Sequence, residues 1–535
     1  MTLAREKTSS VKRAEFIVLS EILNSAPCNK SCSLLEKQSF SGGDRTINLS
    51  LLLEKSVERY ADRPVLAADG RRITYGQLND AVEVTTRRLA RLGMKKGDKV
   101  ALMLPNIPEF VYCYFAIVRA GAVAVLLNTS STPFELTYLL NNSDAKILIT
   151  QPAGEKRYNE IKDRLTSCHT AYIVNAGNGF TDTVNEDSYS QNNLAPAVID
   201  PDDPAEIIYT AGLTGKPLGA VLTHRNLCAE LDMIQQVFRR QPDDVGLCLI
   251  PLFHSFGATV NMLNVVQAGC STVMMDRLTM DTLFSAIEKE KITYICSVPR
   301  LYVGMVFDDK ASKYDLSSLK LCVTGGSAMP AEFIPVFEEK FGVRLLEGYG
   351  LTEAAPACSF NLMDRPAKHG SIGTALIGID IKIVDDEGRE LPRHETGEVI
   401  VRGANVMKGY YKNDEATATV IKDGWLHTGD LGRMDEEGYI FLTGRKKRMI
   451  ITSGFNVYPQ EVEEVLRLHP AVTDTLVIGK EDLMRGEIVK AQVILRQGHQ
   501  PDDKEIIRYC KEYLSSYKAP REIEFVTSLE GKDPG

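Results

Sequence analysis

Short apolar runs that alternate with helical stretches are the feature that most restricts the fold of this 535-residue chain. A helical stretch at Leu49–Tyr60 precedes an apolar run at Pro64–Ala68, and further runs of this kind lie at Lys99–Leu104 and Lys146–Thr150. Helices that separate short Val-, Ile- and Leu-rich runs indicate α/β layers around largely parallel strands. The sequence therefore predicts an α/β protein.

The pattern changes after about Gly373. Ile379–Val384 and Gly397–Arg402 resemble short antiparallel strands. Residues 446–535 have the pattern of a small α+β unit, with helices expected at Pro459–Arg467 and Lys504–Leu514 and strands at Val472–Gly479 and Ile488–Leu495. A chain of this length is too long for one compact core. We expect an N-terminal extension at 1–45, a large α/β domain at 46–445 and a small domain at 446–535, shortened at its end.

Composition and charge argue against several classes of protein. A formal net charge of −9 disfavours a nucleic-acid-binding scaffold, which usually presents a basic face. Cys28 and Cys32 lack a second pair of ligands nearby, so the cysteines are interpreted as reduced, intracellular thiols. The apolar region Phe110–Leu127 is divided by Arg119 and Gly121, which predicts a helix and a strand rather than a transmembrane segment. We expect a cytoplasmic protein, and leave open a peripheral membrane contact and a homodimer.

A glycine-rich segment, Tyr209–Gly219, follows a strand-like run and is interpreted as a phosphate-binding loop. Its three glycines let backbone N–H groups converge on phosphate oxygens, its two threonines add donors, and Lys216 adds a positive charge. The spacing differs from that of a Walker A loop, because Pro217 stands where Ser or Thr would hold magnesium. A simple turn between two strands, with Lys216 in solvent, is the alternative.

The segment Thr210–Asn226 reads TAGLTGKPLGAVLTHRN. It resembles the signature loop of the adenylate-forming superfamily, which includes acyl-CoA synthetases, firefly luciferase and the adenylation domains of peptide synthetases. Similar motifs recur in family order from about Leu49 to Phe525, and the sequence most resembles those of medium- and long-chain fatty acyl-CoA ligases. The resemblance implies a large domain of mixed sheets with a small barrel-like subdomain, followed by a small mobile domain.

The resemblance also implies the site residues. Nucleotide or CoA contacts are expected from Thr210, Gly212, Thr214, Gly215, Lys216, Gly219, Gly325, Gly326, Ser327, Glu347, Gly348, Tyr349, Gly350, Asp430, Arg445 and Gly454. Catalytic roles are expected for His254, Thr352, Glu353 and Lys447, and Glu353 is also the expected Mg²⁺ ligand. ATP, Mg²⁺ and CoA are the implied cofactors and co-substrates.

The chemistry of several of these side chains suits the implied roles. The Tyr349 ring can stack on a purine, and Thr352 can donate to the α-phosphate. Glu353 offers hard oxygen ligands, and the Asp430 carboxylate accepts from ribose hydroxyls. Arg445 stays charged at any working pH.

Other parts of the resemblance concern the acid, CoA and the small domain. His254 is expected beside the acyl carboxylate, and Tyr294–Tyr302 along the acyl pocket, whose apolar character favours a hydrophobic acid. Lys447 is implied as the hinge of the small domain, and Thr452–Pro459 as part of the pantetheine channel.

Simpler interpretations remain open for each motif taken alone. Thr324–Ala328 has the sequence of an ordinary strand-to-helix turn. Glu353 would be a surface carboxylate in most settings, and His254 a core or surface histidine. Arg445–Arg448 would be a solvated charge cluster.

The chain departs from the family pattern at both the loop and the C-terminus. Ala211, Leu213 and Leu218 replace residues that usually supply two hydroxyls and one lysine charge. Lys532 follows a glycine, but the approach to it is compressed, so the role of the family's catalytic C-terminal lysine is not assigned to it. We hypothesise that Lys216 partly replaces the missing charge at Leu218.

The sequence thus predicts an AMP-forming acyl-CoA ligase that converts a carboxylic acid, expected to be a fatty acid, to its CoA thioester through an acyl-adenylate. Two alternatives stay open. The chain could be a weakened or inactive relative that binds nucleotide or acyl-adenylate as a sensor. It could instead transfer the acyl group to a carrier-protein thiol.

Overall fold

The computed structural model describes residues 48–174, 197–211, 216–275, 278–446, 449–482 and 484–529. The predicted extension at 1–45 and the Cys28–Cys32 pair lie outside the described residues, and the three domain bounds stay predictions. Among the described residues, no helix has the length and apolar character to cross a membrane.

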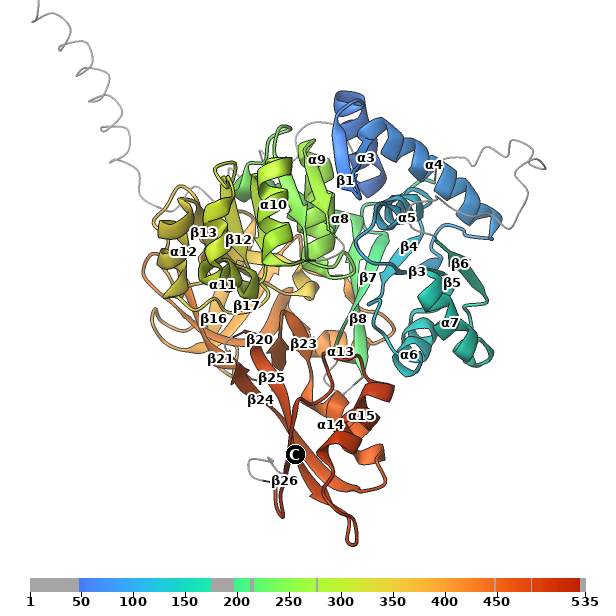
Figure 1. The fold of residues 1–535 in the computed structure, drawn as a ribbon, viewed down its shortest axis with the longest axis vertical. Helices are drawn as coiled ribbons and strands as arrows, with labels where there is room; N and C mark the ends of the chain where they lie inside the picture. The colour runs from blue at the N-terminus through green and yellow to red at the C-terminus, as the bar shows by residue number, and fades with distance from the viewer. Residues whose placement is uncertain are drawn as a thin grey trace, which may run out of the picture. The chain divides into compact units, whose positions relative to one another are not determined.

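A nine-stranded sheet forms one layer of the large domain (Figure 1). In spatial order its strands are β15 (Thr374–Ala375), β14 (Ala357–Phe360), β13 (Arg344–Gly350), β12 (Leu321–Thr324), β11 (Tyr294–Ser297), β9 (Val245–Cys248), β10 (Ser271–Met274), β1 (Pro64–Ala68) and β2 (Arg71–Thr74). The strands from β13 to β1 are parallel, and antiparallel strands lie at both edges.

A seven-stranded sheet forms the second layer. Its order is β18 (Gly409–Tyr410), β8 (Pro217–Thr223), β7 (Pro204–Ala211), β4 (Val123–Leu126), β3 (Lys99–Met103), β5 (Ala145–Thr150) and β6 (Thr170–Ile173). The strands from β7 to β6 are parallel, whereas β8 pairs antiparallel with both β7 and β18. The predicted α/β layering around mostly parallel strands is confirmed.

The described helices of the large domain are α3 (Leu49–Tyr60), α4 (Tyr75–Arg91), α5 (Pro108–Arg119), α6 (Pro133–Ser143), α7 (Pro152–Ile161), α8 (His224–Phe238), α9 (Asn264–Ala268), α10 (Met280–Glu290), α11 (Pro299–Phe307), α12 (Phe333–Phe341) and α13 (Asp414–Val420). A π-helix, η3 (Gly257–Leu263), leads into α9, and three short 3₁₀ helices are η1 (Lys162–Arg164), η4 (Asp309–Lys313) and η5 (Thr352–Ala354).

Two smaller sheets follow along the chain. One has the order β16 (Ile379–Val384), β17 (Gly397–Gly403), β20 (Trp425–Met434) and β19 (Ile421–Lys422), and β21 (Ile440–Arg445) also pairs with β20. The small C-terminal domain contains β23 (Phe455–Val457), β22 (Ile450–Thr452), β25 (Gly486–Leu495), β24 (Val472–Asp482) and β26 (Glu522–Phe525), with α14 (Pro459–Leu468) and α15 (Asp503–Tyr513) beside this sheet (Figure 1). The buried apolar residues from Ile450 to Ala519 form a core of their own.

Local sequence signals explain why α8 forms where it does. The Thr223 side chain accepts a hydrogen bond from the backbone N–H of Asn226, and Asn226 Oδ1 accepts one from the backbone N–H of Thr223, which makes a capping box. The spacing of Leu227, Leu231, Ile234 and Phe238 puts them on one face of this helix, and all four are buried.

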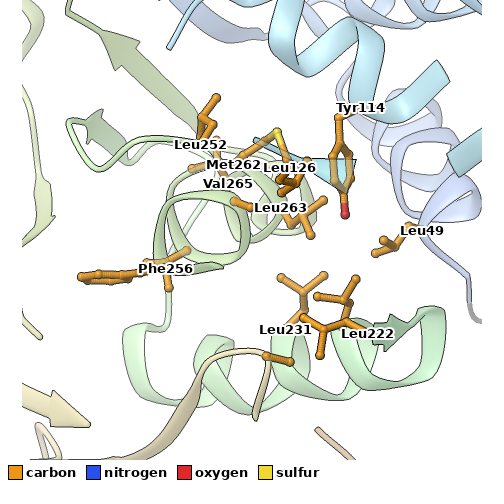
Figure 2. Close-up of a cluster of buried hydrophobic side chains, with 14 of the residues drawn as sticks. Leu49, Tyr114, Leu126, Leu222, Leu231, Leu252, Phe256, Met262, Leu263 and Val265 are labelled. Carbon is orange, nitrogen blue, oxygen red and sulfur yellow. The ribbon is translucent and has the colours of Figure 1, made fainter. Parts of the chain in front are cut away.

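The core between the two large sheets gathers side chains from distant parts of the chain (Figure 2). Leu222 from β8, Leu231 from α8 and Leu263 from η3 are among its buried members. Phe256, which precedes η3, also belongs to this cluster. The helices α8 and η3 are therefore held in place by the core.

A buried ion cluster joins the small domain to the large one. The Lys518 ammonium lies 2.8 Å from Glu135 Oε1 on α6 and 2.6 Å from Glu461 Oε1 on α14. Burial alone would lower the pKa of Lys518, but the carboxylates of Glu461 and Glu135 raise it well above its usual value. Ser515 and Thr132 add hydrogen bonds across the same contact.

Replacing Lys518 with methionine should release this contact. Glu135 and Glu461 would be left buried without their cation, which costs about 3–5 kcal/mol. We expect a loss of this size in the opening free energy of amides in α14, measured by hydrogen exchange. Lys480→Met is the matched control, because Lys480 pairs with Glu522 at the surface and should cost less than about 1 kcal/mol. Equal losses in the two variants would contradict the prediction.

Candidate functional site

The glycine-rich segment is the end of a β-hairpin. Strand β7 runs to Ala211, β8 begins at Pro217, and Tyr209 pairs with Gly219. The expectation of an eleven-residue loop is therefore wrong, because ladder hydrogen bonds continue into the segment from both strands. Gly219 packs closely against the Ile207 side chain, because a Cβ added at position 219 would lie 2.7 Å from Ile207 Cγ2.

The hairpin end is described only in part. Gly212, Thr214 and Gly215 lie outside the described residues, as does Leu213. Lys216 is exposed beside the start of β8, whereas Leu218 is buried opposite Thr210. The roles predicted for the loop glycines and Thr214 stay predictions.

Glu353 is the residue at which three elements converge. Thr210 at the end of β7 donates to Glu353 Oε1 at 3.0 Å, and Tyr410 from β18 donates to the same oxygen at 2.9 Å. Because Thr210 and Tyr410 both donate to Oε1, Oε2 can serve as a ligand for a cation. The backbone oxygen of Glu353 accepts from Met407 N at 2.8 Å, which fixes the turn behind the carboxylate.

Thr352 and His254 lie on adjoining segments. Thr352 Oγ1 is 3.4 Å from Ser255 Oγ, the hydroxyl next to His254. His254 Nδ1 accepts from Phe256 N at 3.2 Å, so the neutral ring carries its proton on Nε2. Burial lowers the pKa of His254 to about 4, from an ordinary value of 6.5. The imidazole is thus a neutral donor, suited to a substrate carboxylate.

Asp430 links the two strands that end near the small domain. Asp430 on β20 pairs with Arg445 on β21, and Arg445 Nε lies 2.7 Å from Asp430 Oδ1. Tyr349 donates its hydroxyl to Asp430 Oδ2 at 2.5 Å. Each carboxylate oxygen retains a further lone pair, so Asp430 can still accept from ribose hydroxyls.

The glycines around Tyr349 are required by packing. A Cβ at Gly348 would lie 2.2 Å from the Phe360 ring, and one at Gly350 would lie 2.0 Å from Pro356 O. The Tyr349 ring itself is 9% exposed, so only a small part of it is available to a purine. Close packing therefore explains why both positions are glycine, which the sequence pattern did not indicate.

Gly325, Gly326, Ser327 and Glu347 lie at the adjoining ends of β12 and β13. Glu347 accepts from Met329 N at 3.0 Å through Oε1, whereas its Oε2 is buried without a partner among the described residues. Burial raises the pKa of Glu347 to about 7. Gly326 has a φ of +79°, a conformation that favours glycine.

A hairpin of the small domain contributes to the same region. Gly454, between β22 and β23, has a φ of +84°, and a Cβ there would lie 2.6 Å from Val298 Cγ1 of the large domain. Burial raises the pKa of Tyr458, and the charges of Glu353 and Asp430 add to this effect. Lys447 and Lys532 lie outside the described residues.

Several residues of the site could not be picked out from the sequence. Tyr410, Ser255 and Tyr458 carry no motif of their own, although each lies within or beside a segment of the resemblance. Glu230 and Asn405 lie behind the Thr352–Glu353 turn, and a polar residue on the apolar side of α8 was the one signal that could have pointed to Glu230.

Two family models match the chain. Residues 53–411 match the model described as AMP-binding enzyme, and residues 461–533 match the AMP-binding enzyme C-terminal domain. The chain belongs to the AMP-binding enzyme family. This result confirms the resemblance to the adenylate-forming superfamily.

Curated relatives of this AMP-binding enzyme are acid–CoA ligases. A long-chain-fatty-acid–CoA ligase of Bacillus subtilis (strain 168) is 34% identical over 512 residues, covering 90% of this chain and 91% of the relative. An oxalate–CoA ligase of Arabidopsis thaliana is 33% identical over 488 residues, covering 90% and 94%. The expected enzyme class, an acid–thiol ligase of the AMP-forming type, is supported, whereas the acid differs among the relatives.

Solved structures share the fold of this AMP-binding enzyme. The amide bond synthetase of Marinactinospora thermotolerans aligns with a TM-score of 0.82 at 27% identity, covering 90% of this chain and 96% of that one. The o-succinylbenzoate CoA synthetase of Bacillus subtilis aligns with a TM-score of 0.78 at 28% identity, covering 89% and 95%. A large N-terminal domain and a small C-terminal domain are therefore established for this enzyme.

The lowered pKa of His254 makes a prediction about pH. With a pKa of about 4, His254 stays neutral throughout neutral and alkaline pH, so its protonation should give no step in kcat/KM above about pH 5.5. His254→Ala should raise KM for the acid roughly tenfold, since a hydrogen bond to a charged group contributes about 1.5–3 kcal/mol. The pH profiles of the two proteins should be parallel. A step near pH 6.5 that disappears in the variant would contradict the prediction.

Proposed function

We propose that this AMP-binding enzyme joins a fatty acid to CoA through an acyl-adenylate. The observation that carries the proposal is the convergence of Thr210, Tyr410 and Glu353 beside the Thr352–Ser255 contact and His254. A carboxylate, a phosphate and a cation all find suited groups within these adjoining segments.

In the first half-reaction a carboxylate oxygen of the acid attacks the α-phosphorus of ATP, and pyrophosphate leaves. His254 would donate from Nε2 to the acid and hold it in place. Thr352 and Thr210 would donate hydroxyl hydrogens to phosphate oxygens as negative charge builds up on them. Asp430 would accept from the ribose hydroxyls, and Arg445 would orient the Asp430 carboxylate through their ion pair.

The Glu353 carboxylate fits a magnesium ion. Oε1 is held by two hydroxyl donors, which leaves Oε2 as a ligand in a fixed direction. No group of three or more His, Cys, Asp or Glu side chains that could hold a metal is present among the described residues. Mg²⁺ usually keeps several waters and binds through one or two carboxylates together with substrate phosphates, so one glutamate is sufficient. The ion would neutralise phosphate charge.

In the second half-reaction the CoA sulfur attacks the acyl carbonyl carbon, AMP leaves, and the thiol proton passes to solvent. The hairpin at Gly454 packs on Val298 beside the nucleotide segments, which supports a role for this hairpin in guiding the thiol. We also propose that the small domain rotates about Lys447 between the two half-reactions, and that the domain boundary lies at 445–446.

The choice of a fatty acid rests on the segment predicted to line the acyl pocket, which begins at β11. Tyr294, Cys296 and Ser297 are buried, and Arg240 bridges this strand to η3 through Cys296 Sγ at 3.4 Å and Val260 O at 2.7 Å. The segment predicted to line the acyl pocket, Tyr294–Tyr302, is mostly apolar in sequence, which favours an alkyl chain. The fatty acyl relatives support the same choice, whereas the oxalate–CoA ligase shows why other acids belong in the test.

A panel of acids tests the proposal. Acids from acetate to palmitate, with benzoate and oxalate, would be assayed for AMP release with ATP, Mg²⁺ and CoA. We expect the highest kcat/KM with a medium- or long-chain acid, and CoA-dependent thioester by mass spectrometry. AMP release without CoA consumption would favour another acceptor, such as the carrier-protein thiol. Lack of turnover with every acid would contradict the proposal and favour a nucleotide-binding sensor.

Lys216 provides a second test. If Lys216 replaces the charge missing at Leu218, Lys216→Ala should raise KM for ATP about tenfold, because a charge-assisted hydrogen bond is lost. Pyrophosphate exchange measures this step alone. Arg225→Ala is the control, because Arg225 pairs with Asp202 at the surface beyond the other end of β8. An unchanged exchange rate in Lys216→Ala would contradict the hypothesis.

A further inference from the structure

The turn that carries Thr352 and Glu353 is buried immediately behind these two residues. Ala354, Ala355 and Ala357 are all buried, and their backbone groups are removed from water. A buried N–H or C=O without a partner costs about 1–3 kcal/mol, so the groups that satisfy this turn also fix its position.

Asn405 satisfies two of these backbone groups. Its side-chain Nδ2 lies 2.8 Å from Ala354 O and 2.9 Å from Ala357 O, and the whole residue is buried. These two carbonyls flank the point where the chain reverses after Glu353. Asn405 therefore ties together the two ends of the turn that follows Glu353.

Glu230 on α8 holds both the turn and Asn405. Its Oε1 accepts from Ala357 N at 2.9 Å, and its Oε2 lies 3.2 Å from Asn405 Nδ2, whose two hydrogens are shared with the carbonyls of Ala354 and Ala357. Glu230 is fully buried, and both of its partners are neutral amide groups. Burial raises the pKa of this carboxyl to about 8, while the bonds from Ala357 and Asn405 lower it.

Helix α8 anchors the segment 404–406 as well. Asn226, four residues before Glu230 and so on the same face of α8, donates to Ala404 O and Val406 O at 2.8 Å each. Asn226 also belongs to the capping box that begins the helix. One helix face thus fixes both the turn and the segment that carries Asn405.

We propose that Glu230 and Asn405 are positioning residues that set the place of Thr352 and Glu353 against the nucleotide. They touch neither the substrate nor the metal ion, and they act through the backbone of residues 353–357. The inference rests on the proposed function, because the roles of Thr352 and Glu353 toward phosphate and Mg²⁺ belong to it. A displacement of about 1 Å in such groups can reduce a rate about 100-fold.

The test compares Glu230→Ala and Glu230→Gln with Glu206→Gln. Glu206 is a matched control, since it is also a fully buried glutamate with a raised pKa, but its partner is the Tyr114 hydroxyl on α5. Calorimetry would measure Kd for ATP with and without Mg²⁺, alongside thermal unfolding of each protein. The binding measurement needs no acid and no turnover.

We expect Mg²⁺ to tighten ATP binding in the unaltered protein and in Glu206→Gln. Glu230→Ala should bind ATP with Mg²⁺ about tenfold more weakly, and Glu230→Gln should show a smaller loss, because its amide oxygen can still accept from Ala357 N. If Glu230→Ala does not fold, Glu230→Gln and Asn405→Ala carry the comparison. The two half-reactions should respond differently in the Glu230 and Asn405 variants. With an acid that the unaltered protein uses, the rate of pyrophosphate exchange should fall at least tenfold, whereas the rate of thioester formation from added acyl-adenylate should fall less than threefold.

Several results would overturn the inference. Kd values within twofold of the unaltered protein in the Glu230 and Asn405 variants would do so, as would an equal loss in Glu206→Gln. Absence of any Mg²⁺ effect in the unaltered protein would also count against it. Normal Mg²⁺-dependent binding that weakens only in the Glu230 and Asn405 variants, with no acid turned over, would support the inference while contradicting the proposed function.

Discussion

Burial of the chain at residues 354–357, immediately behind Thr352 and Glu353, is the constraint on which the rest of the site depends. A turn in water satisfies its own backbone groups with solvent, but a buried turn needs partners from the protein. Here those partners come from α8, from η3 through Thr259, and from the segment that contains Asn405 and Met407. The two large sheets and the later segment of the chain must therefore be assembled before Thr352 and Glu353 have defined positions.

The charge pattern around this turn suits a magnesium nucleotide. The site contains two carboxylates, those of Glu353 and Asp430, which would repel a bare polyphosphate. Arg445 offsets part of this charge through its pair with Asp430. A divalent cation at Glu353 would offset more, which explains how an acidic protein can bind an anionic ligand. His254 adds a hydrogen-bond donor without adding a charge, because burial keeps its ring neutral.

The small domain takes part in this arrangement through two separate contacts. Gly454 packs on Val298 at the site, and Lys518 pairs with Glu135 at α6. The first contact needs a residue without a side chain, and the second needs a buried cation between two carboxylates. Because neither contact is a large apolar interface, the small domain can be held in place without merging its core with that of the large domain.

The sequence by itself determined the elements of this protein and the order of its motifs. Apolar periodicity and capping act between neighbours in the chain, so the start of α8 at Thr223 and its buried face were predictable. The tertiary structure alone decided that Thr210 and Tyr410 meet on one oxygen of Glu353, that the predicted eleven-residue loop is mostly hairpin, and that Glu230 binds the backbone of the turn after Glu353. These contacts join residues far apart in the chain, and no local pattern specifies them. They exist because packing the two sheets buries polar groups that must then find partners across the fold.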